Sequence, residues 1–410
     1  MGTEERPDGP LSTGIAGLDL ILGGGLPRDR LFLLQGEPGV GKTTIALQFL
    51  MDGAARGERV LYITLSETEA EIADIARSHG WSLDCLALME LSDLDRADLE
   101  GENSIFEPSE VDLRETTQAL IARIEEVTPT RVVFDSLSEL RLLAQGALRF
   151  RRQILSLKQY FTTRKMTVLL LDDRSGSASD LQLESIVHGV IRLHQDPPEF
   201  GEDRRRLRVM KLRGVKFRGG YHEYNIHRGG VEVYPRLVAA EHHAAFVHDR
   251  LSSGIAGIDA LLGGGVDRGT STLVIGPPGT GKSALASQYA CAAARRGEGA
   301  VIFAFDEARA KFLARSRALG MDLDQHIDSG RIAVHQIDAA ELGAGEFVHR
   351  VRDAVEQDGA RIVVIDSING FFNSMPSEPF VTAQVHELLS YLGQLGATTF
   401  VLLAPSGLVG

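Results

Sequence analysis

The chain has 410 residues, of which 43% are apolar and 24% charged, and its formal net charge is −13. This composition is globular and excludes a mostly disordered, collagenous or disulfide-scaffold protein, and the length predicts two or three domains. The acidic balance disfavours broad nucleic-acid binding, and no apolar run approaches the ~18 residues of a membrane span. The first ten residues carry no apolar secretory segment, so we expect a cytoplasmic protein. The only cysteines, Cys85 and Cys291, are far apart and outside any CxxC motif, which predicts two reduced, buried thiols.

The first half of the chain alternates between helical and strand-like patterns. Ile15, Leu18 and Leu22 share one face of a short helix, which the glycines at 23–25 should end. A helical stretch covers 44–54, and apolar, strand-like runs lie at 31–35, 59–65, 131–134 and 167–171, with four more strand-like pieces between 185 and 237. Strands that alternate with helices of this length pair in parallel through right-handed crossovers, so we predict an α/β fold with a covered, mainly parallel sheet.

The second half repeats the first. Residues 251–284 align without a gap on residues 11–44, at an offset of 240 and with 18 identities in 34 positions, which indicates a duplicated domain. A helical stretch at 284–294 and strand-like runs at 272–275, 300–305, 361–365 and 398–403 repeat the order of the first half. We predict a first domain over 1–240, a linker over 241–250 and a second domain over 251–410 that lacks counterparts of the strands at 185–237.

Each copy contains a phosphate-binding loop. GEPGVGKT and GPPGTGKS both satisfy G-x-x-x-x-G-K-[ST] between a predicted strand and a predicted helix, the context in which backbone N–H groups cradle phosphates. The lysine of each loop can reach the β and γ oxygens of a nucleotide, and we expect ATP as the ligand. The predicted contacts are Gly36, Glu37, Pro38, Gly39, Val40, Gly41, Lys42, Thr43 and Thr44, and in the second copy Gly276, Pro277, Pro278, Gly279, Thr280, Gly281, Lys282, Ser283 and Ala284.

Acidic residues follow two neighbouring strands in each copy. Asp135 and Asp366 end apolar strands beside the phosphate loop, where each predicts a Mg²⁺ site together with the loop hydroxyl. Those hydroxyls belong to Thr43 and Ser283. An aspartate that only caps the next turn is the alternative reading of such a strand end.

Glutamates after the next strand are candidate general bases. Glu67 follows the strand at 59–65, and Glu307 follows the strand at 300–305 with Asp306 beside it. A carboxylate at this place can orient and deprotonate an attacking water. The alternative is an acid in the first turn of the next helix, where the helix dipole favours negative charge.

A basic segment ends the first copy. Residues 204–218 hold eight cations in fifteen positions, with charged and apolar residues alternating as on one face of a strand. A solvated strand face, a groove for single-stranded nucleic acid, and phosphate contacts to a neighbouring subunit all remain open at this point.

The tandem loops, the duplicated opening LS[TS]GIAG[LI]D…LGGG and KLRG at 211–214 together resemble the KaiC family of RecA-like ATPases. The resemblance covers nearly the whole chain and implies two stacked rings in a hexamer of double-domain subunits, with ATP at subunit interfaces. It also implies nucleotide contacts from Ser78, Lys211, Leu212 and Arg213. The adjacent glutamate pair of the family is Ser66 and Glu67 in the first copy, so one candidate base is lost there.

The leading hypothesis from the sequence is a Mg²⁺-dependent, ring-forming ATPase of signalling or clock type. Serine/threonine autokinase activity follows from the family resemblance alone. A nucleotide-gated signalling scaffold without essential turnover, and a DNA-stimulated recombinase or helicase-like ATPase, are the alternatives. We expect self-association and a protein partner of unknown identity, no membrane contact, and no role in nucleic-acid binding.

Overall fold

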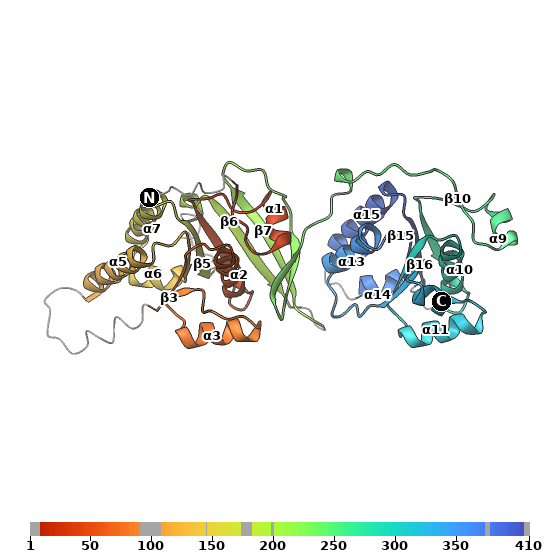
Figure 1. Cartoon of the computed structure of the whole chain (residues 1–410), viewed down its shortest axis with the longest axis horizontal. Coiled ribbons are helices and arrows are strands. Elements are labelled where there is room, and N and C mark those ends of the chain that lie inside the picture. Colours follow the sequence, from red (N-terminus) through yellow and green to blue (C-terminus); the bar gives the residue numbers. More distant parts are fainter. Residues whose placement is uncertain are drawn as a thin grey trace. The chain divides into compact units, whose positions relative to one another are not determined.

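The computed structural model describes residues 9–90, 108–144, 146–173, 183–197, 201–373 and 378–405 (Figure 1). Its contacts divide the chain into two compact units, residues 1–196 with 205–235 and residues 197–204 with 236–410. Each unit contains one copy of an α/β fold on a mainly parallel sheet. The predicted fold class, with fewer strands in the second copy, is therefore confirmed.

The first unit is built on a nine-stranded sheet in the order β3-β2-β4-β5-β1-β6-β7-β8-β9. Its strands are β1 (Leu31–Gly36), β2 (Val60–Thr64), β3 (Ala87–Glu90), β4 (Arg131–Asp135), β5 (Thr167–Asp173), β6 (Gly189–Asp196), β7 (Arg204–Leu212), β8 (His222–His227) and β9 (Gly230–Tyr234). Every pair from β3 to β6 is parallel, whereas β8 pairs antiparallel with both β7 and β9. The carboxyl ends of six strands, β1 to β6, therefore meet at one edge of the sheet.

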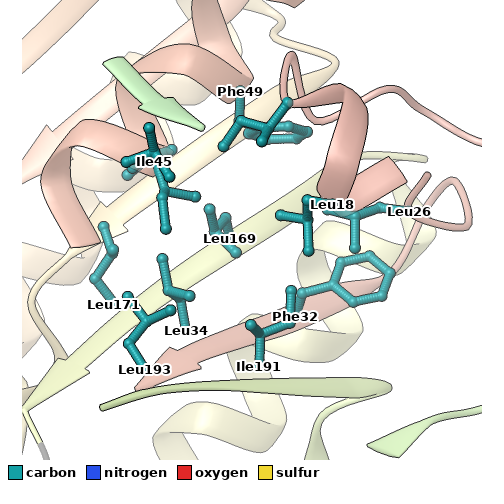
Figure 2. Packing of buried hydrophobic residues seen from close by; sticks show 14 of the residues in the cluster. Leu18, Leu26, Phe32, Leu34, Ile45, Phe49, Leu169, Leu171, Ile191 and Leu193 are labelled. Carbon is teal, nitrogen blue, oxygen red and sulfur yellow. The ribbon is translucent and has the colours of Figure 1, made fainter. Parts of the chain in front are cut away.

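Helices cover both faces of this sheet. One face packs against α1 (Ala16–Ile21), α2 (Lys42–Ala55) and α3 (Glu69–Ser78), and the other against α5 (Pro108–Val127), α6 (Leu137–Leu143) and α7 (Ala147–Thr163). Alternate residues of β1 enter the two cores: Phe32 and Leu34 lie in the first, which Figure 2 shows, while Leu31 and Leu33 lie in the second. Burial on both faces is why β1 reads as a continuous apolar run. Within the described residues no helix is long and apolar enough to cross a membrane.

The second unit contains a five-stranded parallel sheet in the order β12-β16-β15-β13-β14. Its strands are β12 (Ser271–Ile275), β13 (Gly299–Ala304), β14 (Ile332–Gln336), β15 (Ala360–Asp366) and β16 (Thr398–Leu403), and β10 (Arg250–Leu251) pairs with β11 (Val266–Asp267). Its helices are α9 (Ala256–Leu261), α10 (Lys282–Arg295), α11 (Arg309–Ala318), α12 (Leu323–Asp328), α13 (Ala344–Glu356), α14 (Ile368–Asn373) and α15 (Glu378–Gln394), and the short 3-10 turn η1 (Ala239–Glu241) precedes β10. This order matches β1-β5-β4-β2-β3 of the first unit.

The outer edge of β12 distinguishes the two sheets. In the described chain no strand takes the place beside β12 that β6 takes beside β1. Leu33 is fully buried, whereas its counterpart Leu273 is 53% exposed, and Ile21 is fully buried whereas its counterpart Leu261 is 88% exposed. The strands β6 to β9 are thus what buries this side of the first copy.

Two smaller sequence predictions have different outcomes. Gly23, Gly24 and Gly25 follow α1 with φ of 73°, 116° and 128°, a left-handed backbone that glycine adopts without a steric penalty. Cys291 is buried, but Cys85 is exposed, so the prediction of two buried thiols is wrong for Cys85. Cys85 lies in the turn that precedes the short edge strand β3, which has little of the unit's core to cover it.

A buried arginine joins the sheet of the first unit to α2. The side chain of Arg131 is fully buried, and its Nε donates to Glu58 Oε2 at 2.7 Å while its Nη1 lies 3.2 Å from Asp52 Oδ2. The same Nη1 donates to the carbonyls of Ser12 and Phe49, both at 2.8 Å. A guanidinium with this many acceptors offsets its desolvation, and among the described residues its removal leaves Asp52 with only the more exposed Arg56 as a cation partner, and Glu58 with only Arg28 at 3.8 Å.

We predict that Arg131→Ala destabilises the first unit by about 3–5 kcal/mol, because two carboxylates lose their buried cation. Urea unfolding followed by the fluorescence of Trp81, which is the only tryptophan and packs against the first core, would measure this. Arg123→Ala removes a surface pair with Glu126 and should change the stability by less than ~1 kcal/mol. Equal effects of the two substitutions would contradict the prediction.

Candidate active site

The phosphate loop of the first unit joins the end of β1 to the start of α2. Gly39 and Gly41 have φ of 83° and 92°, and a Cβ at Gly41 would also lie 2.6 Å from Ile226 Cδ1 on β8. In the described chain no protein acceptor pairs with the backbone N–H groups of Gly39, Val40 or Gly41. Unpaired N–H groups at a helix N-terminus form a ready site for an anion.

Lys42 folds back over this loop. Its Nζ donates to the carbonyls of Gly36 and Glu37 at 3.0 and 2.9 Å, and lies 2.8 Å from Asp173 Oδ1. Asp173 ends β5, and the register of the sheet pairs it directly with Gly36. The lysine thus lies at the mouth of the loop, and a partly exposed carboxylate holds it.

Asp135 lies beside the first turn of α2. Its Oδ2 accepts from Tyr62 Oη at 2.6 Å and from Thr43 Oγ1 at 3.4 Å. Burial raises the pKa of Asp135, and the Tyr62 hydrogen bond and the Lys42 charge oppose this shift. A threonine hydroxyl and one carboxylate suit Mg²⁺, which usually takes only one or two protein carboxylates and completes its shell with water and phosphate oxygens. Thr43 and Asp135 therefore fit the ion.

Glu67 lies just beyond β2, in a turn that Thr64 fixes. Thr64 Oγ1 donates to the Glu67 carbonyl at 2.8 Å and accepts from its N–H at 3.0 Å. Burial and then the charge of Asp135 raise the pKa of Glu67. Its Oε2 is buried without a hydrogen-bond partner in the described structure. A carboxylate with a raised pKa and an unused acceptor can take a proton from water.

The side chains of Ser78 and Leu212, for which the family resemblance implies nucleotide contacts, both contact their own unit. Ser78 Oγ donates to the carbonyl of Ile75 within α3, and the Leu212 side chain is buried in the core. The next residue, His79, has its Nε2 3.4 Å from Thr44 Oγ1 and its Nδ1 2.9 Å from the carbonyl of His227. A contact to the loop's helix is therefore made by His79, whereas the side-chain hydrogen bond of Ser78 stays within α3.

Lys211 and Arg213 lie at the opposite edge of the sheet from the loop. The N–H of Arg213 donates to the carbonyl of His188, immediately before β6, and β6 runs parallel to β1. The five steps between the six residues of β1 separate the two edges by about 17 Å, at ~3.3 Å per step. Within one unit these two cations are therefore remote from Lys42.

The second unit repeats the loop but not its surroundings. Lys282 Nζ donates to the carbonyls of Gly276 and Pro277 at 2.6 and 3.0 Å. Burial raises the pKa of Asp366, and a hydrogen bond from Ser283 opposes the shift, as Thr43 does for Asp135. This loop and its aspartate thus have the same relation as in the first unit.

Each of the two candidate bases of the second unit already has a polar partner. Glu307 Oε2 lies 2.8 Å from Arg315 Nη1, and Asp306 Oδ2 accepts from Ser367 Oγ at 2.5 Å. Ile75 stands at the place of Arg315 in the first copy. Glu307 thus has a cation partner in α11 that the repeat does not provide for Glu67.

Three residues of the first site were missed by motif reasoning. Tyr62, Asp173 and His79 lie outside the loop motif, and their counterparts in the second copy are the apolar residues Ile302, Ala404 and Leu319. A position that is polar in the first copy and apolar in the second is the sequence signal that could have identified these three residues.

Both copies match one protein family. A family model described as "ATPase: KaiC" matches residues 11–238 and 251–406. The circadian clock oscillator protein KaiC of Parathermosynechococcus lividus is 27% identical over 90% of this chain and 68% of its own length, and that of Acaryochloris marina is 28% identical over 90% and 71%. The circadian clock protein KaiC2 of Synechocystis sp. is 28% identical over 88% of this chain and 64% of its own length. The chain belongs to the KaiC family of ATPases.

Proposed function

We propose that the first copy binds Mg²⁺-ATP and hydrolyses it slowly, at an interface between two copies of this chain. The observation that supports this most directly is the group of side chains at one sheet edge. Lys42, the hydrogen-bonded pair of Thr43 and Asp135, and the unpaired acceptor of Glu67 all lie there. These are the parts that phosphoryl transfer to water requires.

Each residue would act at a stated atom. The loop N–H groups bind the phosphate oxygens, and Lys42 exchanges Asp173 for the β and γ oxygens. Mg²⁺, held by Thr43 and Asp135, would offset negative charge on the phosphates. Glu67 orients a water and accepts its proton as the water oxygen bonds to the γ phosphorus and the bond to the bridging oxygen breaks.

Lys211 and Arg213 would serve the site of a neighbouring copy. Their place at the far edge of the sheet keeps them from their own loop, and a head-to-tail arrangement of subunits brings one edge to the other. Such arrangements close into rings, and the hexamer follows from the family resemblance. Cations that reach the transferring phosphate from a neighbour stabilise its charge.

The second copy would bind nucleotide and hydrolyse it little. Its loop and Asp366 are in place, but Glu307 is paired with Arg315, and the described residues provide no counterpart of Lys211 and Arg213. The nucleotide state of the rings would then govern contacts between subunits or with a protein partner, in the cytoplasm.

We predict that Lys42→Ala reduces ATP turnover on the order of 100-fold or more, whereas Lys282→Ala leaves most of it. The physical reason is that one lysine serves a site with a free base and the other a site whose base is paired. Steady-state phosphate release from each variant would measure the difference. Loss of most turnover in Lys282→Ala alone would reverse the assignment.

Glu67→Gln should lower turnover on the order of 100-fold but raise the melting temperature at pH 7.5 by on the order of 2 °C. The raised pKa means that the folded protein disfavours the charged form, so removing the charge is stabilising above that pKa. The difference should vanish as the pH falls through the raised pKa, because wild-type Glu67 then takes up a proton.

Glu71→Gln is the control with the opposite sign. Its hydrogen bonds to Thr68 at the start of α3 lower the pKa of Glu71, so its charge stabilises the fold at neutral pH. Thermal unfolding of Glu71→Gln should therefore begin at a slightly lower temperature than that of the wild type. A melting temperature of Glu67→Gln below that of the wild type would contradict the proposed environment of Glu67.

Native mass measurement would test the ring. With ATP and Mg²⁺ we expect six copies of the 44.5 kDa chain, and fewer without nucleotide, because the triphosphate screens the cations that face it across each interface. Lys42→Ala with Lys282→Ala should fail to assemble on nucleotide. A wild-type protein that stays monomeric with Mg²⁺-ATP would favour the alternative of a monomeric switch.

A further inference from the structure

Three cations converge on one turn of the first unit, at the edge of the sheet opposite its phosphate loop. Lys158 Nζ donates to the carbonyl of Ile186 at 2.6 Å, and Arg213 Nη2 donates to that of Ser185 at 2.9 Å. Lys211 Nζ donates to the carbonyl of Glu184. Three consecutive carbonyls thus hold three positively charged groups from two different elements, α7 and the end of β7.

The positive charge of this cluster is only partly offset within the described structure, where the charge of Glu184 acts to raise the pKa of Lys211. None of Lys158, Lys211 and Arg213 forms an ion pair there, and the nearby carboxylate of Glu184 pairs with Arg192 at 2.5 Å. Burial and the charge of Arg213 lower the pKa of Lys158, and burial, Arg213 and Lys158 lower that of Lys211. Two of these cations also act on His188, whose pKa falls to about 4 chiefly because of burial, with Lys158, Arg30 and Arg213 adding to the shift.

The cluster is open to another molecule. Arg213 is exposed and the two lysines are half-buried, so each of the three residues has surface that solvent reaches. Positive groups that repel one another gain free energy when a polyanion binds among them. Because the length of β1, about 17 Å at ~3.3 Å per step, lies between this edge of the sheet and the unit's own loop, the anion that binds here has to come from elsewhere.

The repeat provides independent support for Lys158. The offset of 231 that relates Asp135 to Asp366 places Leu389 of α15 at the position of Lys158. Leu157 and Phe161 of α7 are buried, as are their counterparts Leu388 and Leu392, so the two helices align residue by residue. The described part of the second copy thus lacks a counterpart of Lys158 as well as counterparts of Lys211 and Arg213.

We propose that Lys158 is a third phosphate-contacting residue, which enters the loop site of a second copy of this chain beside Lys211 and Arg213. The proposal rests on the interface hydrolysis proposed above, because it supplies one more positive group to that site. Lys158 comes from a helix between β4 and β5, far in sequence from the KLRG segment. The neighbour's cations are thus fixed by two elements that the turn at 184–186 ties together.

Lys158→Met, which keeps much of the side-chain length, should lower the turnover of assembled protein about tenfold or more. Lys158→Arg keeps the charge and should recover most of that loss. Arg152→Gln removes an exposed cation from another face of the same helix and should leave turnover unchanged. Unchanged turnover in Lys158→Met would overturn the proposal. If the methionine variant does not fold, Lys158→Gln is the variant to test in its place.

Mixed assemblies separate a role across the interface from a structural role. Glu67→Gln subunits keep the three cations but lack the base, and Lys158→Met subunits keep the base but lack one cation. In an equal mixture about a quarter of the interfaces join an intact base to an intact cluster, so turnover should rise toward a quarter of wild type. A mixture no more active than the average of its two components would show that Lys158 acts inside its own subunit, and the proposal would be wrong.

The same mixture made with Arg213→Ala distinguishes the two proposals. If mixing with Glu67→Gln restores turnover to Arg213→Ala but not to Lys158→Met, the proposal of hydrolysis at an interface stands and only the role of Lys158 fails. If neither variant is rescued, hydrolysis at an interface fails as well.

Discussion

The chemistry assigned to the first copy depends on the parallel register of four strands. Gly36 at the end of β1 pairs with Asp173 at the end of β5, and Thr64 at the end of β2 pairs with Asp135 at the end of β4. Because neighbouring parallel strands end at one edge, residues more than a hundred positions apart come within hydrogen-bond distance. A register slip of one residue would turn Asp135 toward the opposite face of the sheet and leave the Thr43 hydroxyl without it.

That same sheet separates the two sets of positive charge. Lys42 lies at the carboxyl edge, and the cluster on the turn at 184–186 lies at the amino edge. A single copy therefore cannot surround a triphosphate with both, whereas two copies placed edge to edge can. In the proposed mechanism this separation would link catalysis to assembly, because the positive charge of the cluster would reach the transferring phosphate only from a neighbour.

Much of the fold and part of the site could be predicted from the sequence, for physical reasons. The duplicated opening, the two loops and the strands with acids at their ends are short-range patterns, and the structure has the core strands within two residues of the predicted bounds. The strands β3 and β14 were missed because each is a short edge strand with a weak apolar pattern. The nucleotide contact expected of Leu212 stays a prediction, and its side chain packs into the core because alternate residues of β7 face opposite sides.

The residues that could not be predicted are those whose partners depend on the register or on packing. Tyr62, Asp173 and Lys158 belong to no motif, and only the sheet and the turn at 184–186 bring them to Asp135, Lys42 and Arg213. The comparison between copies distinguishes these three side chains from the loop. The second copy keeps the loop but has apolar residues at all three positions. Phosphate binding needs only the loop amides and one lysine, whereas turnover needs the groups around them. A copy that loses the second set and keeps the first still gains stability whenever nucleotide is bound, by about 2.7 kcal/mol at a ligand concentration of ~100 times its Kd. In the proposed division of roles, low turnover in the second copy is therefore compatible with an intact loop, and the two loops can differ in use while remaining alike in sequence.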